Sequence, residues 1–80
     1  MADYIATFHT HLAALRSRKA LCGKAHPVNL APVPRSLSSS CGTCIRYTAE
    51  EDYIGLLDPD FEQVVEVVKE DEYRVLKTNI

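Results

Sequence analysis

The alternation of apolar and polar positions along the chain predicts four short strands. Runs rich in β-branched and aromatic residues, flanked by turn-forming residues, occur at 4–8, 28–33, 44–48 and 73–78. Pro32 has no backbone N–H to donate to a neighbouring strand, so we expect the second of these strands to lie at a sheet edge.

Two further segments have the features of helices. Thr10 is a suitable N-cap for a helix over about 11–22, and Gly23 can end it. Asp58 and Pro59 resemble a second helix start, where a capping carboxylate precedes a proline in the first turn. The apolar residues that follow recur at i, i+3, i+4 and i+7, namely Phe61, Val64, Val65 and Val68. We therefore predict two helices.

The order of these elements predicts an α+β fold. With 49–57 left as irregular chain, the order β-α-β-β-α-β most economically forms a ferredoxin-like domain, a four-stranded antiparallel sheet with two helices on one face. The expected spatial order of the strands is 4-1-3-2, which places the proline-containing second strand at an edge. A chain of 80 residues has material for one core, so residues 1–80 are expected to form a single domain.

The amino-acid composition argues against several classes of function. Eleven Asp and Glu outnumber nine Lys and Arg, and a formal net charge of -2 argues against a nucleic-acid-binding surface. No apolar run reaches the ~18 residues that span a bilayer, and no secretion signal is visible. Three cysteines, an odd number, suit a reducing compartment better than a disulfide framework. We expect a cytoplasmic protein without a nucleic-acid or membrane partner.

One edge of the expected sheet collects the residues that can carry chemistry. In this topology the end of the first strand, the start of the first helix and the tip of the hairpin between strands two and three share that edge. The residues expected to converge there are His9, Thr10, His11, Arg35, Ser38, Ser39, Ser40, Cys41 and Cys44.

The Cys-x-x-Cys pair of Cys41 and Cys44 permits several kinds of site. The spacing suits a redox disulfide, half of a metal site, or a nucleophilic thiol with a resolving partner. Thioredoxin-like use is disfavoured, because the pair leads into a strand and does not open a helix. A zinc site would need His9 or His11 as a further ligand. A serine-rich turn without chemistry is the simplest alternative.

A reactive thiol at Cys41 has a clear physical basis in the predicted fold. Arg35 and the N-terminus of the first helix are expected on the same edge, and positive charge stabilises a thiolate. The serines at 38–40 supply hydroxyl and backbone donors, and Gly42 permits an unusual backbone angle or the close approach of a ligand. This environment would suit an anionic sulfur species.

Three segments resemble a small bacterial family of selenium/sulfur carrier-like proteins. They are Tyr4-Ile5-Ala6-Thr7-Phe8, then Ala14-Leu15 with Leu21, and then Pro32-Val33-Pro34-Arg35-Ser36-Leu37-Ser38-Ser39-Ser40-Cys41-Gly42. The Pro-Arg-x-Leu-Ser-Ser-x-Cys-Gly core is the most specific part. After it, where the family pattern leads us to expect an aliphatic residue, this chain has Thr43 and Cys44, which adds a second thiol.

The resemblance implies a thiol carrier in which Cys41 accepts persulfide or selenium from a donor protein and passes it to an acceptor protein. Such a role needs no cofactor and no metal, and it is closer to transport than to enzyme catalysis. The residues leave two alternatives. One is an interaction or regulatory module that pairs through its sheet edge, including as a homodimer. The other is a small zinc-binding module.

Overall fold

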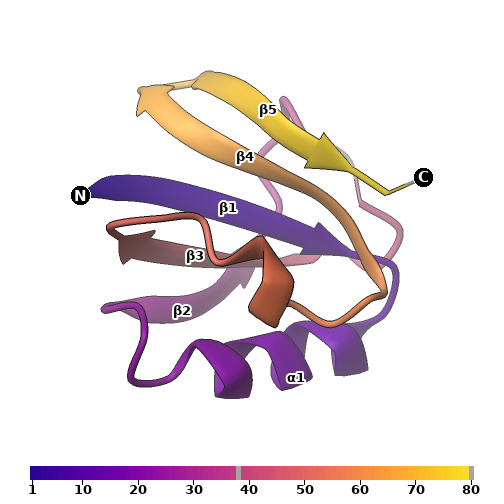
Figure 1. The fold of residues 1–80 in the computed structure, drawn as a ribbon. Coiled ribbons are helices and arrows are strands. Elements are labelled where there is room, and N and C mark those ends of the chain that lie inside the picture. Colours follow the sequence, from indigo (N-terminus) through magenta and orange to yellow (C-terminus); the bar gives the residue numbers. More distant parts are fainter. Residues whose placement is uncertain (38, 80) are drawn as a thin grey trace.

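A computed structural model describes residues 1–37 and 39–79 of the chain. These residues form five strands, one α-helix and one short 3-10 helix (Figure 1). In chain order the elements are β1 (Ala2–Phe8), α1 (His11–Leu21), β2 (Val28–Pro32), β3 (Thr43–Ala49), η1 (Ile54–Leu56), β4 (Phe61–Lys69) and β5 (Glu72–Thr78). The strands form one sheet in the order β2-β3-β1-β4-β5, and every neighbouring pair is antiparallel.

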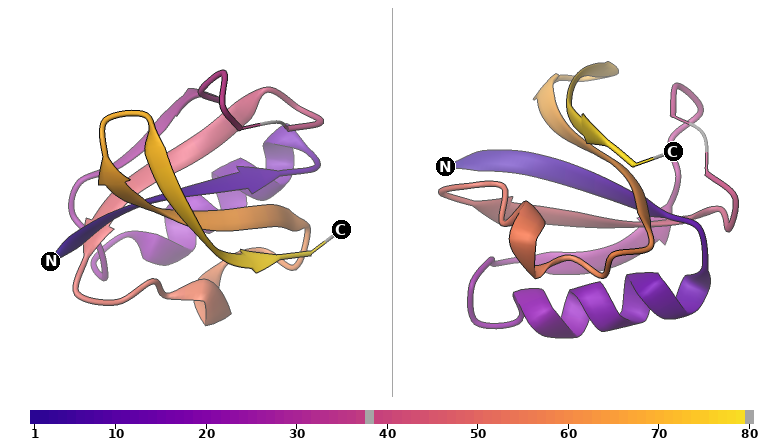
Figure 2. Two further views of the ribbon diagram at one scale, coloured as in Figure 1. Left: turned by 90° about the horizontal axis from the view of Figure 1, so that it is seen from above. Right: turned by 45° about the vertical axis from the view of Figure 1, so that its right-hand side comes forward.

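The predictions for the first half of the chain are confirmed element by element. The Thr10 hydroxyl accepts the backbone N–H of Ala13 at 3.1 Å and caps α1. Gly23, just after the helix, has a left-handed φ of 87°. α1 then returns the chain to β2, which lies at an edge of the sheet as Pro32 requires. Figure 2 shows the helix against one face, alongside β1, β2 and β3.

The predicted ferredoxin-like fold is wrong. The described residues contain a five-stranded sheet with one α-helix, and not a four-stranded sheet with two helices. The segment expected to be the second helix is β4, which pairs with β1. The strand predicted at 73–78 is confirmed as β5 at the other edge of the sheet, but it pairs with β4 and not with β1. Asp58 and Pro59 begin a turn into β4, in which the Asp58 carboxylate accepts the Asp60 N–H at 3.0 Å.

A β-bulge explains why β4 has the apolar spacing of a helix. The pairing of β4 with β1 shifts register between Thr7 and Phe8, and Glu62 is the extra residue on β4. The bulge brings Phe61 and Val64 to the helix side of the sheet although they are three residues apart. The i, i+3 spacing of Phe61 and Val64 therefore arises from a kinked strand. The valine-rich composition of this segment also favours a strand.

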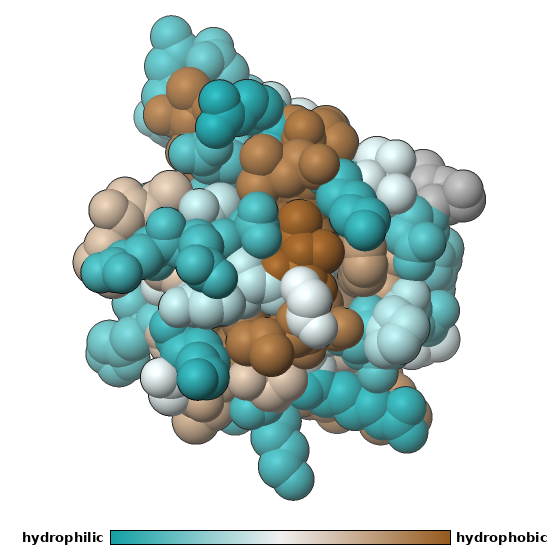
Figure 3. Space-filling view, viewed as in Figure 1, coloured by the Kyte–Doolittle hydropathy of each residue, from teal (hydrophilic) through white to brown (hydrophobic). Residues whose placement is uncertain are grey.

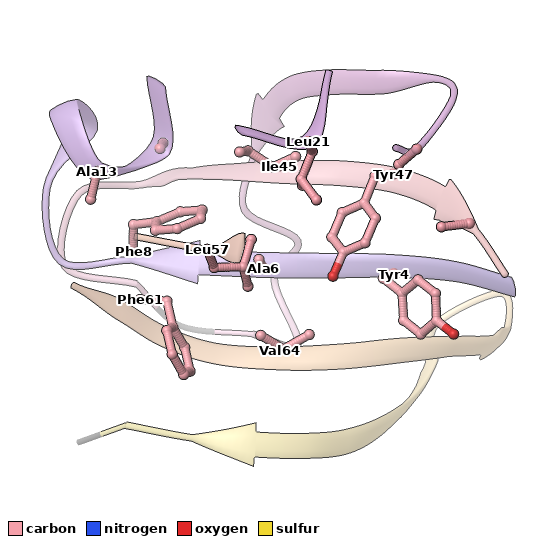
Figure 4. Packing of buried hydrophobic residues seen from close by; sticks show 13 residues of the cluster. Tyr4, Ala6, Phe8, Ala13, Leu21, Ile45, Tyr47, Leu57, Phe61 and Val64 are labelled. Carbon is pink, nitrogen blue, oxygen red and sulfur yellow. The ribbon is translucent and has the colours of Figure 1, made fainter. Parts of the chain in front are cut away.

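The sheet carries a core on each face. On the helix side, strand residues pack against α1 and η1 (Figure 4). They include Tyr4, Ala6, Phe8, Ile45, Tyr47, Phe61 and Val64. On the opposite side a smaller cluster of Ile5, Cys44 and Val65 is covered by Val33, Leu37, Val67 and Tyr73. The sheet is therefore covered on both faces, by the helix on one and by loop and hairpin residues on the other.

Polar and apolar residues are mixed on one face of the molecule (Figure 3). Figure 3 shows polar residues over most of one face, with apolar residues exposed in its middle. No helix among the described residues has the length and apolar character needed to cross a membrane.

Candidate functional site

The loop between β2 and β3 brings Cys41 to the edge of the sheet where β1 ends. The backbone N–H of Val33 donates to the carbonyl oxygen of Gly42 at 3.2 Å and closes the base of this loop. Gly42 has a φ of 74°, a left-handed angle that any residue with a Cβ adopts only under strain. The glycine after Cys41 is therefore explained by backbone conformation.

The sulfur of Cys41 is half-buried and surrounded by polar groups. It donates to the carbonyl oxygen of Phe8 at 3.3 Å and lies 3.5 Å from that of Thr43. The Ser39 hydroxyl oxygen is 3.8 Å from the sulfur and also donates to the Phe8 carbonyl, at 3.0 Å. A carbonyl oxygen accepts a hydrogen bond but cannot donate one, so these contacts suit the protonated thiol.

Glu62 holds the residue before Cys41. Its two carboxylate oxygens accept the backbone N–H of Ser40 at 3.1 and 3.2 Å, and one of them also accepts the Ser40 hydroxyl at 2.9 Å. His9 Nδ1 lies 3.5 Å from the same carboxylate. Burial alone would raise the pKa of Glu62, but hydrogen bonding by the Ser40 hydroxyl and N–H, with the charge of His9, holds it below its usual value.

The residues around the start of α1 also reach this edge. His9 Nε2 lies 3.5 Å from the carbonyl oxygen of Asn79, near the end of the chain. The Thr10 hydroxyl donates to the Asp60 carboxylate at 3.2 Å. His11 Nδ1 lies 3.4 Å from the Thr43 hydroxyl. His9 and His11 therefore lie close to the Cys41 loop, through Glu62 and Thr43, whereas Thr10 contacts the turn that precedes β4.

Cys44 lies on the other face of the sheet. Its side chain is fully buried among Ile5 and Val65, and its sulfur donates to the carbonyl oxygen of Pro32 at 3.6 Å. Burial raises the pKa of the Cys44 thiol, although the charge of Arg46 partly opposes this. Cys41 packs against the helix-side cluster, so the two cysteines face away from each other across the sheet.

Arg35 also lies away from the sulfur. It lines an open depression together with Arg46, Asp71 and Tyr73, beside the cluster that contains Cys44. Among the contacts of the described residues, the Cys41 sulfur meets backbone carbonyls and the Ser39 hydroxyl, and Arg35 is not part of that group.

One further member of the expected set, Ser38, lies outside the described residues. Within 1–37 and 39–79, no three His, Cys, Asp or Glu side chains are grouped in a way that could hold a metal ion. The zinc-site alternative therefore gains no support from the arrangement.

The segment that carries Cys41 is also the segment that has known relatives. A family model described as "Putative Se/S carrier protein-like" matches residues 3–58, well over half of the chain. The chain belongs to this family. The match covers β1, α1, β2, the Cys41 loop, β3 and η1, and it ends before β4. Comparisons with curated proteins and with solved structures found no match.

Sequence reasoning missed the partners that β4 and the C-terminus supply to this Se/S carrier-like segment. The predicted second helix includes Glu62, and nothing in the sequence distinguishes it from the other acidic residues. Only the register of β4 against β1 brings it to Ser40. The Phe8 carbonyl has no signal in the sequence, because every residue carries a backbone carbonyl.

Proposed function

We propose that this protein carries sulfur or selenium on Cys41, from a donor protein to an acceptor protein. The observation that supports this most is the position of Cys41 among the three cysteines. It combines partial exposure with polar contacts to the sulfur, whereas Cys22 is exposed at the end of α1 and Cys44 is buried. Cys41 also lies inside the segment matched to the carrier-like family.

The transfer needs only thiol–persulfide exchange. The donor holds an outer sulfur in an S–S bond. The Cys41 sulfur, after losing its proton, attacks that outer sulfur and forms a new S–S bond while the donor S–S bond breaks. The electron pair of the broken bond stays with the donor thiolate, which takes up one proton, so no external oxidant or reductant is consumed. With selenium in place of the outer sulfur, the same bonds form and break and no external oxidant or reductant is needed.

Ser39 is the nearest side chain that could contact the carried atom. Its hydroxyl oxygen is 3.8 Å from the Cys41 sulfur. The hydroxyl donates to the Phe8 carbonyl, and a rotation about its C–O bond would let it donate instead to an anionic persulfide or perselenide. The Ser40 hydroxyl is engaged with Glu62. We therefore assign the first polar contact of the cargo to Ser39.

The test is the intact mass of the protein after incubation with a cysteine desulfurase and free cysteine, before and after reductant. We expect wild type and Cys44→Ser to gain one sulfur atom that reductant removes, and Cys41→Ser to gain none. Cys44→Ser is the matched control, because it removes a thiol from the same Cys-x-x-Cys pair. No gain on wild type, or an equal gain on Cys41→Ser, would contradict the proposal.

A second candidate rests on β2, whose free side forms one edge of the sheet. An exposed strand edge can pair with a strand of another chain, so an interaction module, including a homodimer, could form here. Sedimentation of wild type and Cys41→Ser over a range of dilutions tests this. A dimer that survives dilution in both would favour it, and two monomeric proteins would remove the homodimer form.

A further inference from the structure

Among the described residues, hydrogen bonds to Phe8 and to Glu62 attach the Cys41 loop to the rest of the domain. On one side, the Ser39 hydroxyl and the Cys41 sulfur both donate to the Phe8 carbonyl, at the end of β1. On the other side, the Ser40 N–H and hydroxyl both donate to Glu62. Ser40 precedes Cys41 directly, so the Glu62 contact restricts where the sulfur can lie.

Glu62 is well suited to this attachment. It is the extra residue of the β-bulge in β4, and bulges commonly redirect a side chain next to a functional site. Its side chain is 14% exposed, and both carboxylate oxygens accept hydrogen bonds from Ser40. Hydrogen bonds from N–H and O–H groups to a carboxylate are stronger than those to a neutral acceptor.

We propose that Glu62 is a positioning residue for Cys41, acting through Ser40, and that the β4–β5 hairpin thereby completes the carrier site. This inference rests on the proposed carrier function. Glu62 lies beyond the residues matched to the family, 3–58. The hairpin that supplies it therefore contributes a part of the site that the matched segment lacks.

The first test compares how fast iodoacetamide, a neutral reagent, alkylates each cysteine in wild type, Glu62→Gln and Glu66→Gln. Glu66 is the matched control, because it lies on the same strand and pairs with Arg74 on the surface. Exposed Cys22 and buried Cys44 are internal references, read separately by tandem mass spectrometry.

We expect Glu62→Gln to raise the alkylation rate of Cys41 relative to Cys22 by about tenfold, the change that corresponds to one hydrogen bond to a charged group. Cys44 should stay protected, and Glu66→Gln should match wild type. An unchanged Cys41 rate, or Cys41 and Cys44 becoming reactive together, would overturn the proposal, since the second result means general loss of structure.

A measurement on unmodified protein covers the case in which Glu62→Gln does not fold. The amide resonance of Ser40 should move with pH as the Glu62 carboxyl titrates, because the amide donates directly to that carboxylate. A Ser40 resonance that does not shift over this pH range would contradict the hydrogen bond between Ser40 and Glu62.

Sulfur uptake separates the two proposals. If Glu62 positions Cys41, Glu62→Gln should take up sulfur from the desulfurase more slowly while iodoacetamide reacts faster. Faster uptake together with faster alkylation would show that Glu62 only covers the sulfur, which overturns the positioning role. A wild type that takes up no sulfur would contradict the carrier function. In that case the alkylation rates and the pH dependence of the Ser40 resonance would still test the Glu62 contact.

Discussion

Cys41 and Cys44 are separated by two residues but lie in opposite environments. Cys41 lies at the sheet edge on the helix side, with its sulfur against two carbonyls and a hydroxyl. Cys44 is fully buried on the other face, within an apolar cluster. Cys41 is therefore partly exposed to solvent, whereas Cys44 contributes to packing.

The difference shows that Cys-x-x-Cys spacing does not by itself make a redox pair. Gly42 turns the chain between the two cysteines, and β3 begins at Thr43, where side chains alternate between faces. A disulfide between Cys41 and Cys44 would require this turn and the start of the strand to rearrange. The resolving-thiol role of Cys44 stays a prediction, and it needs a change in the loop.

Alkylation of wild type gives the largest expected contrast between the two cysteines. Cys44 should react only when the chain opens, and opening that costs about 5 kcal/mol slows its reaction by more than ~10³ relative to a free thiol. Cys41 should react in the native state. Site-resolved mass spectrometry over time measures both rates, and equal rates would remove the distinction.

Matched asparagine substitutions test the same contrast through stability. Cys44→Asn buries an amide in an apolar cluster and should lower the free energy of unfolding by about 3 kcal/mol. Cys41→Asn should cost less than about 1 kcal/mol, because its amide can donate to the Phe8 carbonyl and the site is partly open. Urea denaturation measures both. Equal losses would contradict the assigned burial.

The stability contributed by the Glu62 contact to the Cys41 loop should depend on pH in the acidic range. The pKa of Glu62 is lower in the folded chain than in the unfolded one. Its stabilising contribution is therefore complete above the unfolded value of about 4.3 and is lost as pH falls through the folded pKa. Glu62→Gln should lower the free energy of unfolding near neutral pH by about 1.5 kcal/mol.

Urea denaturation at several pH values measures this effect. The difference between wild type and Glu62→Gln should shrink as the solution is acidified, because the wild-type carboxylate becomes neutral. Glu66→Gln again serves as the control. If the difference in unfolding free energy between the two proteins stays constant with pH, the charge of the Glu62 carboxylate does not contribute to the contact with Ser40.

The smallest effect concerns the turn between the two cysteines. Gly42→Ala places a Cβ at a φ of 74°, and we expect a loss of about 1 kcal/mol in the free energy of unfolding. Gly55→Ala is the matched control. Both glycines have open space where the Cβ would lie, but only Gly42 has a positive φ. Thermal unfolding of the two variants measures this, and equal losses would contradict the role of backbone strain.

Local signals in the sequence were sufficient to predict β1, α1, β2 and β3. The Thr10 cap, Gly23 after the helix and Pro32 at an edge strand each act through neighbouring backbone groups, so they can be recognised without the rest of the fold. The Pro-Arg-x-Leu-Ser-Ser-x-Cys-Gly core likewise pointed to the family that the chain belongs to.

Prediction failed at β4 because its pattern depends on pairing. Phe61 and Val64 have helical spacing, and only the bulge opposite Thr7 and Phe8 shows that a strand can place both on one face. With β4 taken as a helix, the pairing of β5 with β4 and the position of Glu62 could not be foreseen. The error in one element therefore hid a component of the proposed site.

The sequence by itself determined the family, the elements of the first half and the location of Cys41 in a hairpin loop, because these depend on short-range patterns. Tertiary structure alone decided that Cys41 and Cys44 lie on opposite faces, that Arg35 lies away from the sulfur and that Glu62 holds Ser40. Each of these depends on strand register and on which segments cover each face of the sheet, and such long-range pairing is not written in any local run of residues.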